Sequence, residues 1–379
     1  MAITKIDSSM LEDVSGADNL VKLDANAKIP AGTGANLLNK PGPFTSASDP
    51  AIDSNKALGT EWLNTTSGEM YVCTDATTGA NIWTNVGAGT GDISRYSWQG
   101  ESFGYVHGGA GPSNEINRYS FATATAAGTD IGDLVTSLSG AAGLSSKTHG
   151  YACGGLAGPH TNQIQKFDYS ASVTTSDWDD LSSLRASCAP HSDGIHGFLS
   201  GGYLINGAEP TVIEKFPFAS ASGVIDVGDM NFESRPAGCQ SDTHGYPCGG
   251  EGTNPDHINK FAFASIANAT SHGDLNAATG AGGGGVSSTT HGYVGGGVGS
   301  SNVIQKFAFA SNTTGTDVGN LTTTVSGMTA PASSTTYGYV SGSYPPSNVI
   351  QRWSFSSDGD ATDVGDLTYS TYGMCGSAN

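Results

Sequence analysis

One pattern occurs six times along the chain and limits the folds that the chain can adopt. In each repeat a glycine precedes an aromatic residue, and a glycine pair begins four residues after that first glycine; in the sixth repeat Gly342-Ser343 replaces the pair. The first glycines are Gly104, Gly150, Gly197, Gly245, Gly292 and Gly338, which lie 46, 47, 48, 47 and 46 residues apart. A period of about 40 to 50 residues in a strand-rich sequence predicts a β-propeller or a similar array of sheets.

The composition favours strands over helices in these repeats. Glycine supplies 55 of the 379 residues, and a glycine inside a helix costs about 1 kcal/mol relative to alanine. Each repeat divides into four short strands, which in the second repeat begin near residues 143, 149, 164 and 175. We expect the glycine before the aromatic residue to adopt a positive φ in a tight turn. We expect the glycine pair to permit close approach of backbones near a central axis.

In the repeats, a hydrophobic-aromatic strand that ends in a glycine pair is followed by a strand of the type Asn-x-Ile-x-Lys-Phe. With these motifs, the chain resembles the Kelch-repeat β-propeller family over about residues 93–379. The resemblance implies an all-β, six-bladed propeller with four strands in each blade. The fourth strand departs from the Kelch pattern, because the tryptophan expected there occurs only as Trp178. Residues 368–379 and residues 95–101 compete for the first strand of the first blade. We favour the C-terminal stretch, because Cys375 lies in the register of the preceding first strands.

Residues 1–92 do not share the repeat. We expect an extended segment over residues 1–58 and a small β module over residues 59–92, ahead of the propeller at 93–379. The stretches 23–31, 62–75 and 81–83 resemble N-terminal regions of tailed-bacteriophage fibres and related virion proteins. This resemblance implies that residues 1–58 bind other virion proteins, and such regions are sometimes trimeric, so the chain is expected to form a homo-oligomer.

The charge and the absence of targeting signals exclude several classes of protein. The formal net charge is −19, which opposes nucleic-acid binding because phosphate recognition requires clustered lysine and arginine. Residues 1–14 lack the apolar core of a signal peptide. The sequence also contains no apolar run of about 18 residues, so no membrane-spanning helix is predicted. The six cysteines are interpreted as free thiols. We therefore expect a virion protein that is assembled in the host cytoplasm.

Most polar residues that recur in the repeats are interpreted as structural. Four repeats carry a histidine at the same position: His149, His196, His244 and His291. The first and sixth repeats have Phe103 and Tyr337 there, so the position does not require a metal ligand and we expect local packing. Basic residues recur in the third strands and are expected to pair with acidic residues of the fourth: Arg118, Lys166, Lys215, Lys260, Lys306 and Arg352. No catalytic set, metal site or cofactor motif is predicted, although calcium at an Asp-Gly turn stays open.

The loops after the glycine pairs differ most between repeats, and variable loops on a rigid scaffold commonly carry binding sites. Tyr203 and Tyr344 offer aromatic faces suited to sugar rings, whereas asparagine and histidine side chains can hydrogen-bond sugar hydroxyls. The predicted ligand-binding residues are His160, Tyr203, Asn206, Asn254, His257 and Tyr344.

These observations predict a bacteriophage structural protein that is not an enzyme. Its N-terminus anchors it to the virion, as in a tail fibre, and its propeller attaches to a glycan or a protein on the host surface. A second hypothesis is a head fibre or capsid decoration protein whose propeller packs on neighbouring virion subunits. A third is a glycan-active enzyme built on a propeller, which the repeats oppose because no acidic cluster interrupts their symmetry.

Overall fold

A computed structural model describes residues 42–86 and 97–379, apart from short gaps at 112, 124, 126, 170–172, 174, 222, 233–234, 252–253, 280–283, 298–300 and 326–328. The chain divides into two compact units, Met1–Arg95 and Tyr96–Asn379. The described residues form strands and turns, and none of them forms a helix of the length and apolar character that a membrane span requires.

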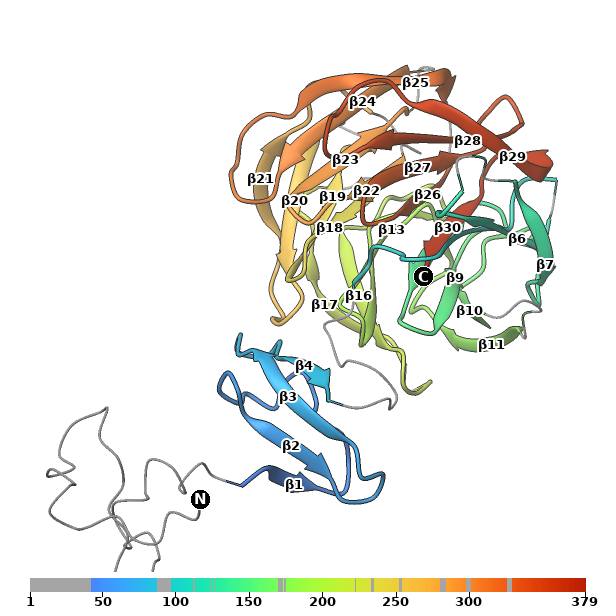
Figure 1. Ribbon diagram of the computed structural model, residues 1–379. Coiled ribbons are helices and arrows are strands. Elements are labelled where there is room, and N and C mark those ends of the chain that lie inside the picture. Colours follow the sequence, from blue (N-terminus) through green and yellow to red (C-terminus); the bar gives the residue numbers. More distant parts are fainter. Residues whose placement is uncertain are drawn as a thin grey trace, which may run out of the picture. The chain divides into compact units, whose positions relative to one another are not determined.

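The smaller unit contains one four-stranded sheet (Figure 1). Its strands, in spatial order, are β1 (Phe44–Ser46), β2 (Glu61–Asn64), β3 (Met70–Asp75) and β4 (Ile82–Asn85). The first strand runs parallel to the second, and the other neighbours are antiparallel. Four buried residues form its core: Trp62, Tyr71, Cys73 and Trp83.

The boundary expected at residue 58 is wrong, because strand β1 lies within the segment expected to be extended. Residues around position 50 also belong to this sheet unit: the indole Nε1 of Trp83 donates to the carbonyl of Ala51 at 3.2 Å, and the amide of Asn81 donates to the carbonyl of Ile52 at 2.7 Å. The sheet unit therefore includes residues from about 44 onward. Of the predicted attachment segment, residues 1–58, residues 1–41 lie outside the described residues.

In the described residues of the larger unit, six four-stranded sheets share one plan, in which the strands lie in order from the innermost outward (Figure 1). The first sheet is β30 (Cys375–Ala378), β5 (Phe103–His107), β6 (Glu115–Ser120) and β7 (Thr129–Asp133). The second is β8 (Ala142–Ser145), β9 (His149–Cys153), β10 (Gln163–Asp168) and β11 (Thr175–Asp180). The third is β13 (Ala189–Ser192), β14 (His196–Ser200), β16 (Val212–Pro217) and β17 (Ile225–Asp229).

The other three sheets follow the same plan without interruption. The fourth is β18 (Ala237–Gln240), β19 (His244–Cys248), β20 (His257–Ala262) and β21 (Thr270–Asp274). The fifth is β22 (Gly284–Ser287), β23 (His291–Gly295), β24 (Ser301–Ala308) and β25 (Thr316–Val325). The sixth is β26 (Ala330–Ser333), β27 (Tyr337–Ser341), β28 (Ser347–Ser354) and β29 (Thr362–Thr371).

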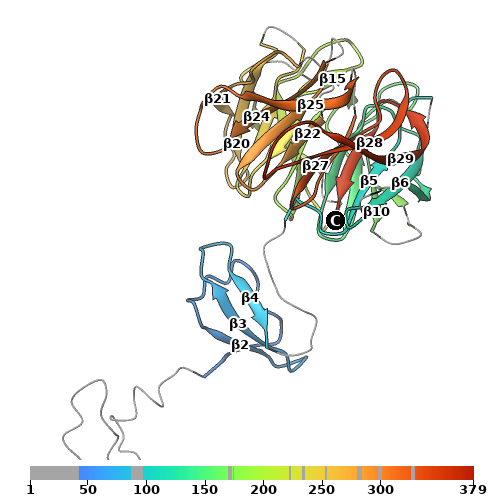
Figure 2. The same ribbon diagram turned by 45° about the horizontal axis from the view of Figure 1, so that its top comes forward.

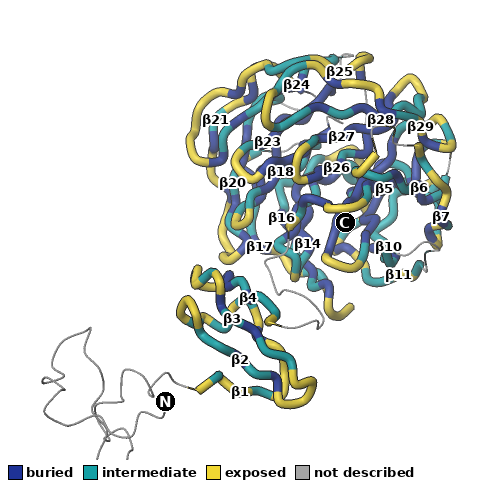
Figure 3. Tube along the Cα trace, in the orientation of Figure 1, coloured by how far each residue is buried: buried dark blue, intermediate teal, exposed yellow. Residues whose placement is uncertain are grey.

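The innermost strands give the larger unit a propeller-like, all-β architecture. Each contacts the next in the order β8, β13, β18, β22, β26 and β30, and β30 contacts β8. The C-terminal strand β30 pairs with β5, so the preference for the C-terminal stretch over residues 95–101 is confirmed (Figure 1, Figure 2). Buried residues run through the inner strands, whereas exposed residues gather at the turns (Figure 3).

The loops after the glycine pairs and the connections between successive sheets lie on one face, which we call the glycine-pair face. The amide of Gly109 donates to the carbonyl of Leu138 at 2.7 Å, and the amide of Gly155 donates to that of Arg185 at 2.8 Å. Both carbonyls belong to connections that lead into innermost strands. Residues from neighbouring sheets are therefore held together on this face.

The glycine before each aromatic residue has a different role from the one expected. These six glycines have no positive φ, whereas both members of the first five glycine pairs do. A β-carbon at Gly292 would overlap the ring of Phe307, and one at Gly197 would lie 2.6 Å from the ring of Phe216. The first glycine makes room for an aromatic ring from the adjacent strand, and the glycine pair supplies the left-handed backbone conformation.

Replacing Gly292 by alanine should destabilise the protein by about 1–3 kcal/mol, because the new methyl group forces the Phe307 ring out of its position. Gly295→Ala, in the same strand, is the matched control: its new β-carbon would lie 3.5 Å from the nearest atom, which is ordinary contact. Chemical denaturation followed by circular dichroism should separate the two variants. Equal stabilities would show that the ring does not require this glycine.

The repeated basic residues also differ from their expected role. Register places Lys166 opposite Ser176 and not opposite an aspartate. The Lys166 ammonium instead lies 3.7 Å from the centre of the Trp178 ring. The other five repeated basic residues also lie over aromatic rings. All six therefore share a cation–π contact, and Lys306 also forms an ion pair with Asp358 of the next sheet, at 2.9 Å.

Candidate functional site

Two small hollows lie on the axis of the larger unit, on either side of a constriction. The second residue of each innermost strand lines both hollows: Gly143, Pro190, Gly238, Gly285, Pro331 and Gly376. A β-carbon at Gly143 would overlap the carbonyl of Gly376, and one at Gly376 would overlap that of Pro331. The backbones of neighbouring innermost strands therefore touch each other around the axis.

The linker residues before β5 cover the hollow on the far side from the glycine-pair face. Trp98 lines this hollow, and the buried side-chain amide of Gln99 donates to the carbonyls of Ser287 at 3.3 Å and Ser334 at 3.0 Å. The amide of Gly100 donates to the carbonyl of Ser333 at 2.7 Å. Residues of the segment that competed with β30 for the first strand position are thus bound at this end of the axis.

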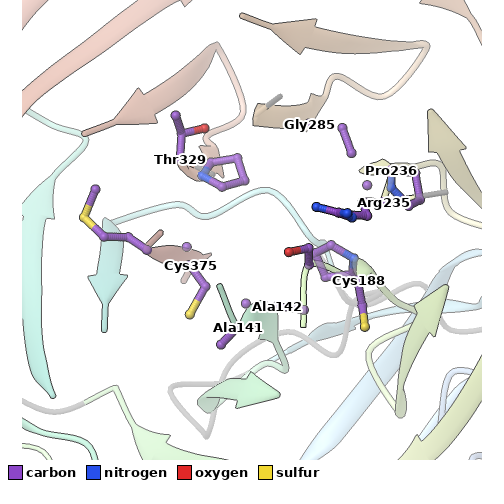
Figure 4. A pocket seen from close by; sticks show the side chains of 16 residues that line it. Ala141, Ala142, Cys188, Arg235, Pro236, Gly285, Thr329 and Cys375 are labelled. Atoms are coloured by element: carbon purple, nitrogen blue, oxygen red, sulfur yellow. The ribbon is translucent and has the colours of Figure 1, made fainter. Parts of the chain in front are cut away.

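The hollow on the glycine-pair face has a volume of about 60 Å³, enough for a few water molecules. Its walls are small or apolar, and the side chain of Arg235 extends over it (Figure 4). Thr329 also lines it, and among the described residues its buried hydroxyl has no hydrogen-bond partner. Arg235 is the one charged side chain among the sixteen residues that line this hollow.

Arg235 is held by residues from two neighbouring loops. Its Nε donates to Oε1 of Glu209 at 2.8 Å, and its Nη2 lies 3.0 Å from Oε2 of Glu251. The guanidinium carbon lies 4.3 Å from the centre of the Tyr203 ring, and the centre of the His160 ring lies 5.1 Å from that of Tyr203. We call these five residues the Arg235 cluster. They come from three consecutive sheets and their connections, beginning with the sheet of β8.

A second feature, next to the third sheet, also breaks the symmetry of the repeats. Arg185 and Glu214 form an ion pair whose side chains are 0 % and 1 % exposed. Nη1 of Arg185 donates to the carbonyl of Gly201 at 3.1 Å, and the Ser182 hydroxyl donates to Glu214. Arg185 belongs to the two-residue strand β12 (Arg185–Ala186), which pairs with β15 (Tyr203–Leu204). The buried ion pair therefore supports the ribbon that carries Tyr203.

Glu214 occupies a position where the other five sheets carry an amide side chain. In those sheets an amide oxygen accepts from a backbone amide in, or just after, the fourth strand of the preceding sheet, as Gln165 does from Thr136 at 2.9 Å. The equivalent acceptors elsewhere are Asn117, Asn259, Gln305 and Gln351. The third sheet thus replaces a hydrogen bond between neutral groups by a charged one, which is a local departure from the repeat symmetry.

The structure brings two of the six predicted ligand-binding residues together. His160 and Tyr203 contact each other in the Arg235 cluster, although Arg235 covers the Tyr203 ring that was expected to stack on a sugar. Asn206 is exposed at the tip of the same loop, where its Oδ1 accepts from the amide of Ala208 at 3.0 Å. Burial lowers the pKa of His160 below its ordinary value, so its imidazole is neutral at neutral pH.

The other three predicted residues make separate contacts. Nδ1 of His257 lies 2.9 Å from Oδ1 of Asp274, and Asn254 is exposed in the loop before it. Tyr344 is 52 % exposed and meets Tyr372 edge to face, with ring centres 5.0 Å apart. Tyr344 therefore keeps an open aromatic surface, but no contact joins it to the Arg235 cluster among the described residues.

The sequence pattern did not predict Arg235, Glu209 or Glu251 as site residues. A signal for the first was present: residues 96–379 contain nine lysines and arginines, and six of these occupy the repeated third-strand position. The other three are Lys147, Arg185 and Arg235, and the structure places both arginines at the symmetry-breaking region. The two glutamates gave no such signal, because they lie in loops that do not align between repeats.

The repeated histidines make local contacts, as expected. Nδ1 of His149 lies 2.8 Å from the hydroxyl of Thr148, and His244 and His291 make the same contact with their preceding threonines. His196 contacts Asp193 at 2.9 Å. No group of three or more metal-ligating side chains occurs in the described part of the chain.

His107 and Cys375 form a buried pair next to the axis, with Nδ1 and Sγ 2.8 Å apart. Burial lowers the pKa of His107 to about 3 and raises the pKa of Cys375 above its ordinary value. Both shifts favour the neutral forms, whereas a nucleophilic cysteine acts as a thiolate. The pair therefore packs the protein and does not resemble an activated nucleophile.

The free energy of unfolding should fall as the pH drops from about 6.5 toward 3. The pKa of His107 is about 3 in the folded protein and about 6.5 in an unfolded chain, so in this range the unfolded state binds more protons. The variant His107→Cys introduces the residue that two other repeats carry at this position, Cys153 and Cys248. Its free energy of unfolding should fall less steeply over the same pH range. Urea denaturation at several pH values measures this difference, and identical slopes would contradict it.

No family model matches the sequence, and no curated protein matches it significantly.

Proposed function

We propose that the six sheets of the larger unit are the blades of one closed, Kelch-like β-propeller. The circular order of contacts among the innermost strands supports this proposal. The pairing of β30 with β5 supports it too, because the last strand of the chain then joins the first sheet. An experimental density map with five or seven blades, or with an open end, would overturn it.

We further propose that the chain is a structural protein of a tailed-bacteriophage virion. In this proposal the N-terminal part attaches to the particle and the propeller binds a carbohydrate or a protein of the host surface. The observation that carries the binding role is the Arg235 cluster, where aromatic and charged side chains break the repeat symmetry on the glycine-pair face. The division into two compact units fits an anchor joined to a binding head.

The arrangement favours binding over glycoside hydrolysis. Hydrolysis of a glycosidic bond commonly requires one carboxylic acid that donates a proton and a second carboxylate that acts as nucleophile or base. In the Arg235 cluster, Glu209 and Glu251 both bind the same guanidinium. An arginine that engages both groups fixes them as hydrogen-bond acceptors, which suits recognition of a ligand.

Antibodies against the full-length protein should label purified phage particles at the tail or its fibres, and the soluble protein should reduce adsorption of the phage to host cells. Absence of the protein from purified particles would overturn the virion assignment. Labelling spread over the capsid, without competition for adsorption, would replace host binding by the decoration role.

Deleting residues 2–41 in the phage should leave a folded protein that is no longer incorporated into particles. The deletion stops before β1, because residues 44–46 belong to the sheet of the smaller unit. Immunoblots of lysate and of purified particles measure production and incorporation separately. Normal incorporation of the shortened protein would contradict the predicted anchoring role of the N-terminus.

A further inference from the structure

We propose that the Arg235 cluster selects uncharged carbohydrate: hexoses or N-acetylhexosamines, and not sugars that carry carboxylate, sulfate or phosphate. This inference rests on the proposed binding function and names the class of ligand. It follows from the position of one arginine, from the charges around it, and from the size of the hollow below it.

Arg235 is fixed in place and keeps donors for a ligand. Its Nε and Nη2 bind the two glutamates, and the Tyr203 ring supports its plane. Nη1 has no hydrogen-bond partner within the described part of the chain, and the side chain extends over the axial hollow (Figure 4). Two N–H groups of a pre-oriented guanidinium are therefore available to hydroxyl or acetamido oxygens.

The charge of the cluster disfavours an anionic ligand. Glu209 and Glu251 together place two carboxylates against one guanidinium, so the cluster carries a net negative charge. His160 adds no positive charge, because burial lowers its pKa. The whole chain has a net charge of −19, which also repels anions at a distance.

The same carboxylates suit a ligand that carries hydroxyl groups. A carboxylate offers about four lone-pair positions, and the contacts to Arg235 use one oxygen of each glutamate. Sugar hydroxyls both donate and accept, so they can bind the remaining carboxylate positions and Nη1 together. The hollow of about 60 Å³ is too small for a sugar ring, so the ring must lie across its mouth.

The test uses the full-length protein on an array of immobilised glycans that includes neutral, sialylated, uronate-containing and sulfated members. We expect neutral glycans to bind more strongly than acidic ones. Arg235→Lys should weaken that binding about tenfold or more, because lysine lacks the planar fork of donors. Glu251→Gln should raise binding of acidic glycans relative to neutral ones, because it removes the excess negative charge.

Arg352→Lys is the matched control, since Arg352 also lies over a tyrosine ring, at 4.4 Å, and four repeats carry lysine at that position. It should bind glycans like the wild type, and thermal melting should show that all three variants fold. Preference of the wild type for acidic glycans, or unchanged binding by Arg235→Lys, would overturn the inference and leave the proposed function standing. If the protein adheres to host cells but binds no glycan, the inference is likewise overturned and the proposed function stands. Failure to bind both cells and glycans would overturn the proposed function as well.

Discussion

Glu214→Ala should destabilise the larger unit by about 3–5 kcal/mol, the range for removing one partner of a buried ion pair. The change leaves the Arg185 guanidinium, which is fully buried, without its carboxylate. It also removes the acceptor of the Ser182 hydroxyl. We expect the loss to be this large because water cannot reach the guanidinium to replace the missing contact.

The repeats supply a control for this prediction. Leu138 and Gln165 occupy the positions equivalent to Arg185 and Glu214 in the preceding repeat. The double variant Arg185→Leu/Glu214→Gln should therefore be close to the wild type in stability, since replacing a whole buried pair by packed neutral groups is often neutral or stabilising. Urea denaturation followed by far-UV circular dichroism compares the three proteins. A double variant as unstable as Glu214→Ala would show that the charges themselves are required.

Much of the fold could be predicted because each repeat contains the residue patterns that specify its own strands and turns. Alternating residues define the strands, and the 46- to 48-residue period aligns them in six equivalent copies. The position of Cys375 in the register of the first strands favoured the C-terminal strand β30 for the first sheet, as the structure confirms. These features depend on spacing along the chain, which the sequence contains directly.

The misinterpreted features depend on contacts between strands. A glycine before an aromatic residue is compatible with a turn, and only the register reveals that Gly292 lies opposite Phe307 in the adjacent strand. The lysine and aspartate positions looked complementary, but a register shift in the third and fourth strands places Lys166 opposite Ser176. The residue pattern predicts which face of a strand a side chain occupies. Which residue lies opposite it on the neighbouring strand depends on register shifts at β-bulges, which the pattern does not reveal.

The Arg235 cluster was harder to predict for a related reason. Its members come from loops and connections of three sheets, and they lie up to 91 residues apart between His160 and Glu251. Of these, His160 and Tyr203 were found because their loops vary between repeats. Arg235 could have been found by asking which basic residues lie outside the repeated position. Glu209 and Glu251 are recognisable only from their contacts in the fold, because acidic residues are common in this chain.

Phe309→Ala should also destabilise the larger unit by about 3–5 kcal/mol, the range for truncating a buried phenylalanine. Phe309 is 8 % exposed, and its ring stacks on Tyr246 with centres 4.6 Å apart and planes at 23°. Tyr246 belongs to the preceding sheet, so the contact joins two neighbouring sheets. The variant would leave a cavity between them that the surrounding strands cannot readily fill.

Phe355 provides the comparison, because it occupies the equivalent position in the next repeat but is only half-buried. Its ring centre lies 5.0 Å from that of Tyr293, with the planes at 33°. Phe355→Ala removes the same atoms from a more exposed site, so its loss should be smaller than that of Phe309→Ala. Chemical denaturation of both variants measures the difference. If Phe309→Ala unfolds at the wild-type midpoint, or if Phe355→Ala is the less stable variant, stacking between sheets at this position does not hold the unit together.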